Sequence, residues 1–290
     1  MSKKVPAARK NSGNKISNRI PAARKKAQNK RKAEQVRELE IMEHDQEARK
    51  EGPQRKTWSH HDMNTLRPVN ARQTEALENW ANGDNVALIG SAGTGKTLLS
   101  CYAAASVVFR KSEEQEHIVV VRSAVEARRI GFLPGTTEEK LAAYEQPYTD
   151  GMTWLFGRKS SYDDMKEAGK VEFHSTSFLR GVTWDNAVII LDEAQNMTFH
   201  EINTVLTRVG QNSRVIVTGD TKQCDFDGTR EHSGLPMFLE IIKDIKGFSV
   251  VEFTRADIVR SGFVRSWITA SEQYQESLDR GAKVAQIARR

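Results

Sequence analysis

The amino-acid sequence predicts an α/β fold in which a parallel sheet carries helices on both faces. From residue 70 onward, short apolar runs rich in β-branched residues alternate with helix-compatible segments. These runs are apolar throughout rather than alternating, which is typical of strands buried on both faces. The first run leads directly into a glycine-rich turn and then into a helix. Residues 90–97 of this turn, Gly-Ser-Ala-Gly-Thr-Gly-Lys-Thr, fit the pattern G-x-x-x-x-G-K-[ST] of a phosphate-binding P-loop.

Positive charge is concentrated at the start of the chain. The net charge is +6, yet residues 1–32 hold twelve Lys and Arg and no acidic residue, so residues 33–290 carry a net charge of −6. Residues 1–32 contain no aromatic residue and no leucine, and we predict that they are disordered. Such a basic tail fits contact with nucleic-acid phosphates, and the alternative is a solubilising tail without a partner.

Residues 33–69 follow as a densely charged, helix-prone segment or linker, and a P-loop ATPase domain is predicted over 70–290. The two cysteines, Cys101 and Cys224, form no disulfide framework. No apolar run approaches the roughly 20 residues that a membrane span needs. We therefore expect a soluble, cytoplasmic protein without membrane contact.

The first predicted helix begins at Asn70 and runs to about Trp80. It contains Gln73, whose side-chain amide offers both a donor and an acceptor to an adenine edge. Since this glutamine precedes the glycine-rich turn, we predict that it contributes to nucleotide binding. The alternative is an ordinary surface glutamine.

The glycine-rich turn follows the strand Val86–Ile89 and precedes a helix over Leu98–Phe109. Its glycines let the backbone approach a phosphate chain with N–H groups pointing inward, and the helix directs its positive end there. We expect Lys96 to reach the β- and γ-phosphates of ATP and Thr97 to place its hydroxyl on Mg²⁺. The predicted nucleotide-binding residues are Gly90, Ser91, Ala92, Gly93, Thr94, Gly95, Lys96 and Thr97.

Two further strands are predicted at His117–Val121 and Val171–His174, with a helix over Lys140–Phe156 between them. The clearest later strand, Ala187–Leu191, is followed at once by an acidic pair. Ligands in open α/β sheets bind at the carboxyl ends of strands.

The acidic pair fits two different tasks at such a strand end. Asp192 would hold Mg²⁺, directly or through water, and Glu193 would orient and deprotonate the attacking water. The alternative is that the two carboxylates cap the next helix.

The strand Arg214–Thr218 ends in a polar loop that contains Asp220 and Gln223. A glutamine at this position can sense the γ-phosphate or hold the attacking water, and the alternative is a plain loop residue. The remaining predicted elements are helices over Thr198–Val209 and Gly234–Ile245, a strand over Phe248–Phe253, and a mainly helical C-terminus from Arg255.

Five blocks of the sequence, in order, resemble the PhoH family of ATPases. They are 90–97, 123–127 with 131–135, 178–181, 189–196 and 217–223, within a region of about residues 70–270. That family is similar to the first RecA-like domain of superfamily-one helicases. The resemblance implies a RecA-like sheet, adenine contact by Gln73, and a role for Asp220 with Gln223 in coupling hydrolysis to nucleic acid. Short members of the family are common in phages, so the resemblance is compatible with a phage origin and a host-cytoplasmic location.

The resemblance also implies a homo-oligomeric ring, a hexamer. Helicases usually close two RecA-like domains over ATP, and the second domain supplies an arginine. With one such domain in this chain, the arginine would come from a neighbouring subunit. Arg180 and Arg260 are candidates for such an arginine, and a structural or nucleic-acid contact is the alternative for each. Some relatives add a nuclease domain, for which we expect no room in this chain.

The sequence therefore predicts an ATP hydrolase that uses Mg²⁺ and acts on single-stranded RNA or DNA, with helicase-like activity. An ATP-dependent switch that acts on a protein partner is the alternative. A small-molecule kinase fits poorly, because a water-activating Glu193 favours hydrolysis over transfer.

Overall fold

The computed structural model of the chain describes residues 58–110, 113–123, 137–179, 181–223 and 232–287. The predicted basic tail 1–32, the charged segment up to residue 57, and Arg180 lie outside these residues.

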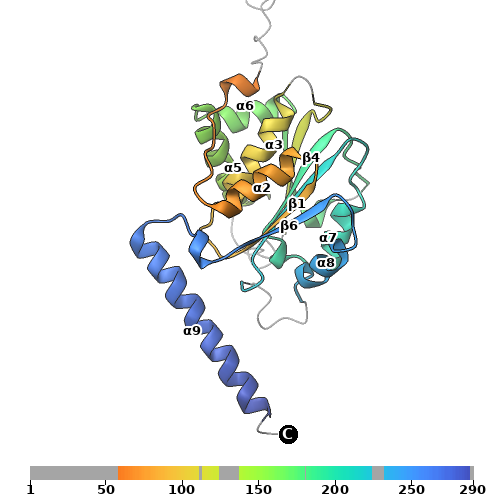
Figure 1. Cartoon of the computed structure of the whole chain (residues 1–290). Helices are drawn as coiled ribbons and strands as arrows, with labels where there is room; N and C mark the ends of the chain where they lie inside the picture. The colour runs from red at the N-terminus through yellow and green to blue at the C-terminus, as the bar shows by residue number, and fades with distance from the viewer. Residues whose placement is uncertain (1–57, 111–112, 124–136, 180, 224–231, 288–290) are drawn as a thin grey trace, which may run out of the picture. The chain divides into compact units, whose positions relative to one another are not determined.

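A six-stranded parallel sheet forms the centre of the described chain (Figure 1). All five neighbouring strand pairs are parallel. The six strands predicted from the sequence are confirmed, each to within one residue at its ends. In spatial order they are β3 (Val171–Ser175), β2 (His117–Arg122), β4 (Ala187–Asp192), β5 (Arg214–Gly219), β1 (Asn85–Gly90) and β6 (Phe248–Phe253).

Helices cover both faces of this sheet, as the apolar strands require (Figure 1). Successive strand side chains point to opposite faces, so that Val86 and Leu88 join one core cluster while Ala87 and Ile89 join the other. The first face carries α2 (Ala71–Ala81), α3 (Lys96–Val108), α5 (Thr137–Phe156) and α6 (Ser161–Glu167). The second face carries α7 (Phe199–Leu206) and α8 (Leu235–Ile242), and α9 (Gly262–Ile287) follows β6.

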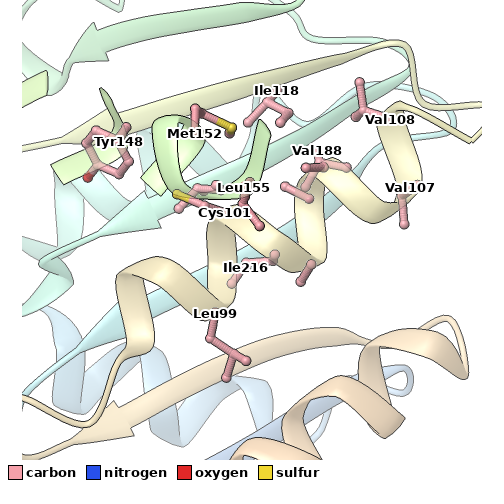
Figure 2. Close-up of a cluster of buried hydrophobic side chains, with 14 of the residues drawn as sticks. Leu99, Cys101, Val107, Val108, Ile118, Tyr148, Met152, Leu155, Val188 and Ile216 are labelled. Atoms are coloured by element: carbon pink, nitrogen blue, oxygen red, sulfur yellow. The ribbon is translucent and has the colours of Figure 1, made fainter. Parts of the chain in front are cut away.

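Helix α3 is held firmly between the sheet and α5. Figure 2 shows Leu99 and Cys101 of α3 in one buried cluster with Met152 and Leu155 of α5 and with Val188 of β4. Fully burying a large apolar side chain contributes about 1.5–3 kcal/mol. This packing fixes the N-terminus of α3, and with it the glycine-rich turn, at the carboxyl edge of the sheet.

Two features differ from the sequence-based expectation. The sequence pattern does not predict α6, because a seven-residue helix with two buried apolar side chains, Tyr162 and Met165, gives little periodicity. The segment at Arg255 is a 3₁₀ turn, Arg255–Asp257, rather than the start of the last helix. Thr254 and Asp257 cap this turn reciprocally, and the chain then becomes extended at Ile258 before α9 begins.

Among the described residues, no helix combines the length and apolarity that crossing a bilayer requires.

Candidate nucleotide-binding site

The predicted phosphate, metal and water-activating residues meet in one cavity at the carboxyl edge of the sheet. The strand order places the ends of β4, β5 and β1 side by side, next to the start of α3. The cavity has a volume of about 750 Å³. Its lining includes Gly93, Gly95, Lys96, Thr97, Asp192, Glu193, Asp220, Gln223 and Arg260.

The glycine-rich turn begins where β1 and β6 run close together. Gly90 has a φ of 132°, a value that side-chain-bearing residues rarely adopt. A Cβ atom at Gly90 would lie 1.9 Å from the carbonyl oxygen of Phe253 in β6. The turn therefore needs glycine here, both for its conformation and for its packing against the neighbouring strand.

Lys96, the first residue of α3, turns its ammonium group back onto the loop. Its Nζ donates to the carbonyl oxygens of Gly90 at 2.6 Å and Ser91 at 2.9 Å. Burial lowers the pKa of Lys96, and the nearby carboxylates, above all that of Asp220, oppose this shift. The ammonium is thus placed at the loop and faces the anionic side of the cavity.

Asp192, the last residue of β4, is buried and its carboxylate is held by hydroxyl groups. The Tyr148 hydroxyl of α5 donates to Oδ2 at 2.5 Å, and the Thr218 hydroxyl of β5 donates to Oδ1. Burial, followed by the charge of Asp192, raises the pKa of Tyr148 well above its usual value, so the hydroxyl remains a donor. Tyr148 is absent from the sequence prediction, since it lies 44 residues before its partner and in no recognisable motif.

On the prediction that Asp192 holds Mg²⁺, replacing Tyr148 with phenylalanine is expected to weaken Mg²⁺ binding by about tenfold, because partners behind a metal ligand typically contribute 10–100-fold to affinity or activity. Nucleotide binding titrated against Mg²⁺ would measure the shift. Tyr102→Phe is the matched control, since no hydrogen bond of the Tyr102 hydroxyl is found among the described residues. An unchanged Mg²⁺ requirement in Tyr148→Phe would show that Asp192 needs no such support.

Glu193 adopts a left-handed backbone conformation, with a φ of 55°, directly after β4. Its carboxylate accepts a hydrogen bond from Gln195 Nε2 at 2.5 Å, and its backbone N–H donates to Asp192 Oδ1 at 3.1 Å. Burial and then the charge of Asp192 raise the pKa of Glu193. A non-glycine residue held in this conformation stores about 1–3 kcal/mol of strain, a feature that clusters at functional sites.

Gln195 links the acidic pair to the loop after β5. Its Oε1 accepts from the backbone N–H of Asp220 at 3.0 Å, while its amide nitrogen holds Glu193. Burial raises the pKa of Asp220, whose Oδ2 is buried and has no hydrogen-bond partner among the described residues. Gln195 is absent from the site residues predicted from the sequence, although its position two residues after Glu193 is a usable signal.

Gln73 is buried between two backbone segments. Its Oε1 accepts from Val69 N–H and its Nε2 donates to Thr94 O, both at 3.0 Å. A second cavity, of about 400 Å³, adjoins it beside the glycine-rich turn. Apolar side chains line much of this cavity, among them Leu66, Val69, Leu98, Trp154 and Val259.

A model of the PhoH-like protein family matches residues 65–272, well over half of the sequence. The chain belongs to this family. The PhoH-like proteins of Mycobacterium tuberculosis (strain ATCC 25618 / H37Rv) and Bacillus subtilis (strain 168) are each 36% identical to it. The matches cover 78% and 72% of this chain and 64% and 65% of the respective relatives. Protein PhoH of Escherichia coli (strain K12) is also 36% identical, over 72% of this chain and 60% of its own length. The PhoH-like chain thus matches less than two thirds of each of these relatives.

Solved structures resemble the PhoH-like chain only distantly. The large terminase from a thermophilic bacteriophage has a TM-score of 0.44 and 14% identity, covering 72% of this chain and 50% of the terminase. The Pif1 helicase from Candida albicans has a TM-score of 0.30 and 17% identity, covering 65% of this chain and 41% of the helicase.

The oxygen donors in the main cavity of the PhoH-like chain fit Mg²⁺. Thr97 and Asp192 both line it, and Mg²⁺ in nucleotide sites is usually held by one or two carboxylates together with substrate phosphates. A glycine cradle and a half-buried ammonium beside these oxygens are suited to a triphosphate.

Proposed function

We propose that this PhoH-like chain hydrolyses ATP with Mg²⁺ and couples the reaction to single-stranded RNA or DNA. One observation carries the hydrolase assignment. The strained Glu193 lies beside Asp192 in the cavity that also contains Lys96, so a base, a metal ligand and a phosphate-binding cation share one space. This combination is the one that water attack on a γ-phosphate needs.

In the proposed reaction the loop and the N-terminus of α3 bind the triphosphate through backbone N–H groups. Lys96 exchanges its bonds to the loop carbonyls for bonds to the β- and γ-phosphates, while Thr97 and Asp192 hold the metal. Mg²⁺, when bound there, would neutralise charge on the phosphate oxygens. Glu193 orients a water molecule and takes its proton as the oxygen attacks the γ-phosphorus, and ADP leaves. Its raised pKa makes the carboxylate a stronger base.

The smaller cavity is proposed to hold the adenine ring. Its apolar lining suits a planar base, and Gln73 and Gly95 connect it to the glycine-rich turn. The bond from Val69 uses one lone pair of Gln73 Oε1, and the bond to Thr94 uses one N–H of Nε2. A second lone pair and a second N–H remain for the base.

Coupling to nucleic acid is proposed from the loop after β5 and from the charge of the chain. Asp220 and Gln223 line the cavity at the end of β5. A loop that contacts a nucleic-acid strand at this position could also respond to the γ-phosphate. The twelve Lys and Arg of residues 1–32 give this segment the positive charge that binding to nucleic-acid phosphates requires.

A homo-oligomeric ring is part of the same proposal, and its support comes from α9. Phe263, Trp267 and Tyr274 are 80%, 66% and 66% exposed, and their spacing of four and seven residues puts them on one helix face. We assign this face to a second copy of the chain. Light scattering with ATP that finds only monomers would contradict the ring.

The same aromatic face keeps the alternative function open, a nucleotide-dependent switch that binds a different protein. Steady-state ATP hydrolysis with and without single-stranded RNA and DNA separates the two functions. We expect several-fold stimulation that falls steeply with salt and weakens when residues 1–32 are deleted. Stimulation by neither nucleic acid would favour the switch.

The blank for this assay is Lys96→Ala, which removes the ammonium from the cavity. Hydrolysis that persists in this variant would come from a contaminant, and a wild-type rate no higher than the blank would overturn the hydrolase proposal. Lys243→Ala serves as the matched control, since Lys243 is exposed directly after α8 and pairs only with Glu240 among the described residues.

A further inference from the structure

The segment between the 3₁₀ turn and α9 lies against the glycine-rich turn of its own chain. The backbone N–H of Val259 donates to the Gly93 carbonyl oxygen at 3.0 Å. A Cβ atom at Gly93 would lie 2.9 Å from Arg260 Cγ and 3.6 Å from a methyl carbon of Ile258. The stem of Arg260 therefore packs directly over the loop that binds phosphate.

Contacts on the other side of Arg260 hold the same segment in place. Ile268 of α9 approaches Gly93, since the Gly93 Cβ position is 3.2 Å from its terminal methyl. Glu272, one turn further along α9, accepts a hydrogen bond from the Ser91 hydroxyl at 3.2 Å. Residues before and after Arg260 in the chain thus hold it against the glycine-rich turn.

The guanidinium of Arg260 differs from those of its neighbours in sequence. Arg255 bonds to the Glu272 carboxylate at 2.8 Å, and Arg265 bonds to the Ile258 carbonyl at 2.6 Å, so both have structural roles. Arg260 is exposed, lines the main cavity, and makes no hydrogen bond or ion pair with any described residue. Its positive charge is available to a ligand in a cavity that already holds Lys96 and Glu193.

We propose that Arg260 binds the γ-phosphate of the nucleotide held by its own chain. A guanidinium presents a planar fork of donors that matches phosphate oxygens, and a fixed stem lowers the entropy lost on binding. In hydrolysis, the same group stabilises the charge that develops on the transferring phosphate. This inference rests on the proposed ATP site. It also gives Arg260 a different role from a finger donated to a neighbouring subunit, because its stem is packed on its own glycine-rich turn.

The first test compares ADP with a non-hydrolysable ATP analogue by calorimetric titration of the full chain with Mg²⁺. Arg260→Ala should bind the analogue about tenfold more weakly or worse, while its affinity for ADP changes by less than about twofold, as expected for loss of a charge-assisted bond to the terminal phosphate. Arg260→Lys should recover part of the difference. Equal effects on both nucleotides, or none, would overturn the proposal.

Arg110→Ala is the matched control, since Arg110 is exposed after α3 and pairs with Glu113. It should bind both nucleotides as the wild type does, and an analogue-specific loss in this variant would overturn the assignment to Arg260. Because the readout is binding, it does not depend on turnover. A chain that binds but never hydrolyses ATP would refute the proposed function and still test Arg260.

A second test separates action within one chain from action across subunits. Chains with Lys96→Ala and chains with Arg260→Ala are co-expressed with different tags and purified through both tags. If Arg260 serves its own site, the mixed assembly hydrolyses ATP no faster than the two single-variant preparations combined. Restored hydrolysis would show that an Arg260 from a Lys96→Ala chain completes a neighbouring site, and would overturn the proposal.

Discussion

Replacing Glu193 with glutamine is expected to lower ATP turnover by at least about a hundredfold while nucleotide affinity stays within a few fold, since a positioned general base contributes about 10²–10⁴ to rate. The substitution removes the proton acceptor and keeps the shape of the side chain. The glutamine carbonyl can still accept the bond that Gln195 donates to Glu193. Binding and hydrolysis should therefore separate in this variant.

Glu193→Gln should also be at least as stable as the wild type. Burial and the charge of Asp192 disfavour the ionised form of Glu193, so a neutral amide relieves both effects. Phosphate release in a single turnover, a nucleotide titration and a melting temperature together test the variant. Glu240→Gln on α8 is the control, because Glu240 is exposed and pairs with Lys243. A turnover within tenfold of wild type would remove Glu193 from the role of base.

The strands were predictable because their signal is local. A run such as Val188–Leu191 is apolar at every position. Such a run is typical of a strand covered on both faces or of a buried helix, and its short length favours the strand. The spatial order of the strands depends on contacts between distant segments. No local signal indicates that β6 pairs with β1, or that β4 lies between β2 and β5.

The same distinction applies to the site. Lys96, Thr97 and the pair Asp192 and Glu193 belong to contiguous patterns, and the structure brings all of them to one cavity. Tyr148 reaches Asp192 from a helix 44 residues away, so only the packing of α5 on α3 reveals it.

Arg260 illustrates a further limit of sequence reasoning. Its place depends on the 3₁₀ turn Arg255–Asp257, which ends the chain's regular structure before α9, and on the bond between Val259 and Gly93. A continuous helix from Arg255 would carry Arg260 on a different path. The sequence could nominate the arginine, but the proposal that it serves its own chain rests on this backbone bond and on the packing of its stem over Gly93.

Replacing Gly90 with alanine is expected to destabilise the fold by more than about 3 kcal/mol, because a forbidden backbone conformation and a severe steric overlap act together. The new Cβ would lie 1.9 Å from the Phe253 carbonyl oxygen. Gly90 and Phe253 are paired residues of β1 and β6, so relief requires these strands to separate at that point. Urea unfolding followed by circular dichroism would measure the loss.

Gly157→Ala is a close control for this experiment. Gly157 also has a positive φ, 69°, but a Cβ there would meet no atom within 4 Å. It should lose only about 1–2 kcal/mol, the conformational penalty alone. Equal losses of unfolding free energy in the two variants would mean that β6 moves away from the new Cβ atom at no energetic cost. A much larger loss for Gly90→Ala would show that the stability of the fold depends on the close contact between the start of the glycine-rich turn and β6. This strand is the one that precedes Arg260 in the chain.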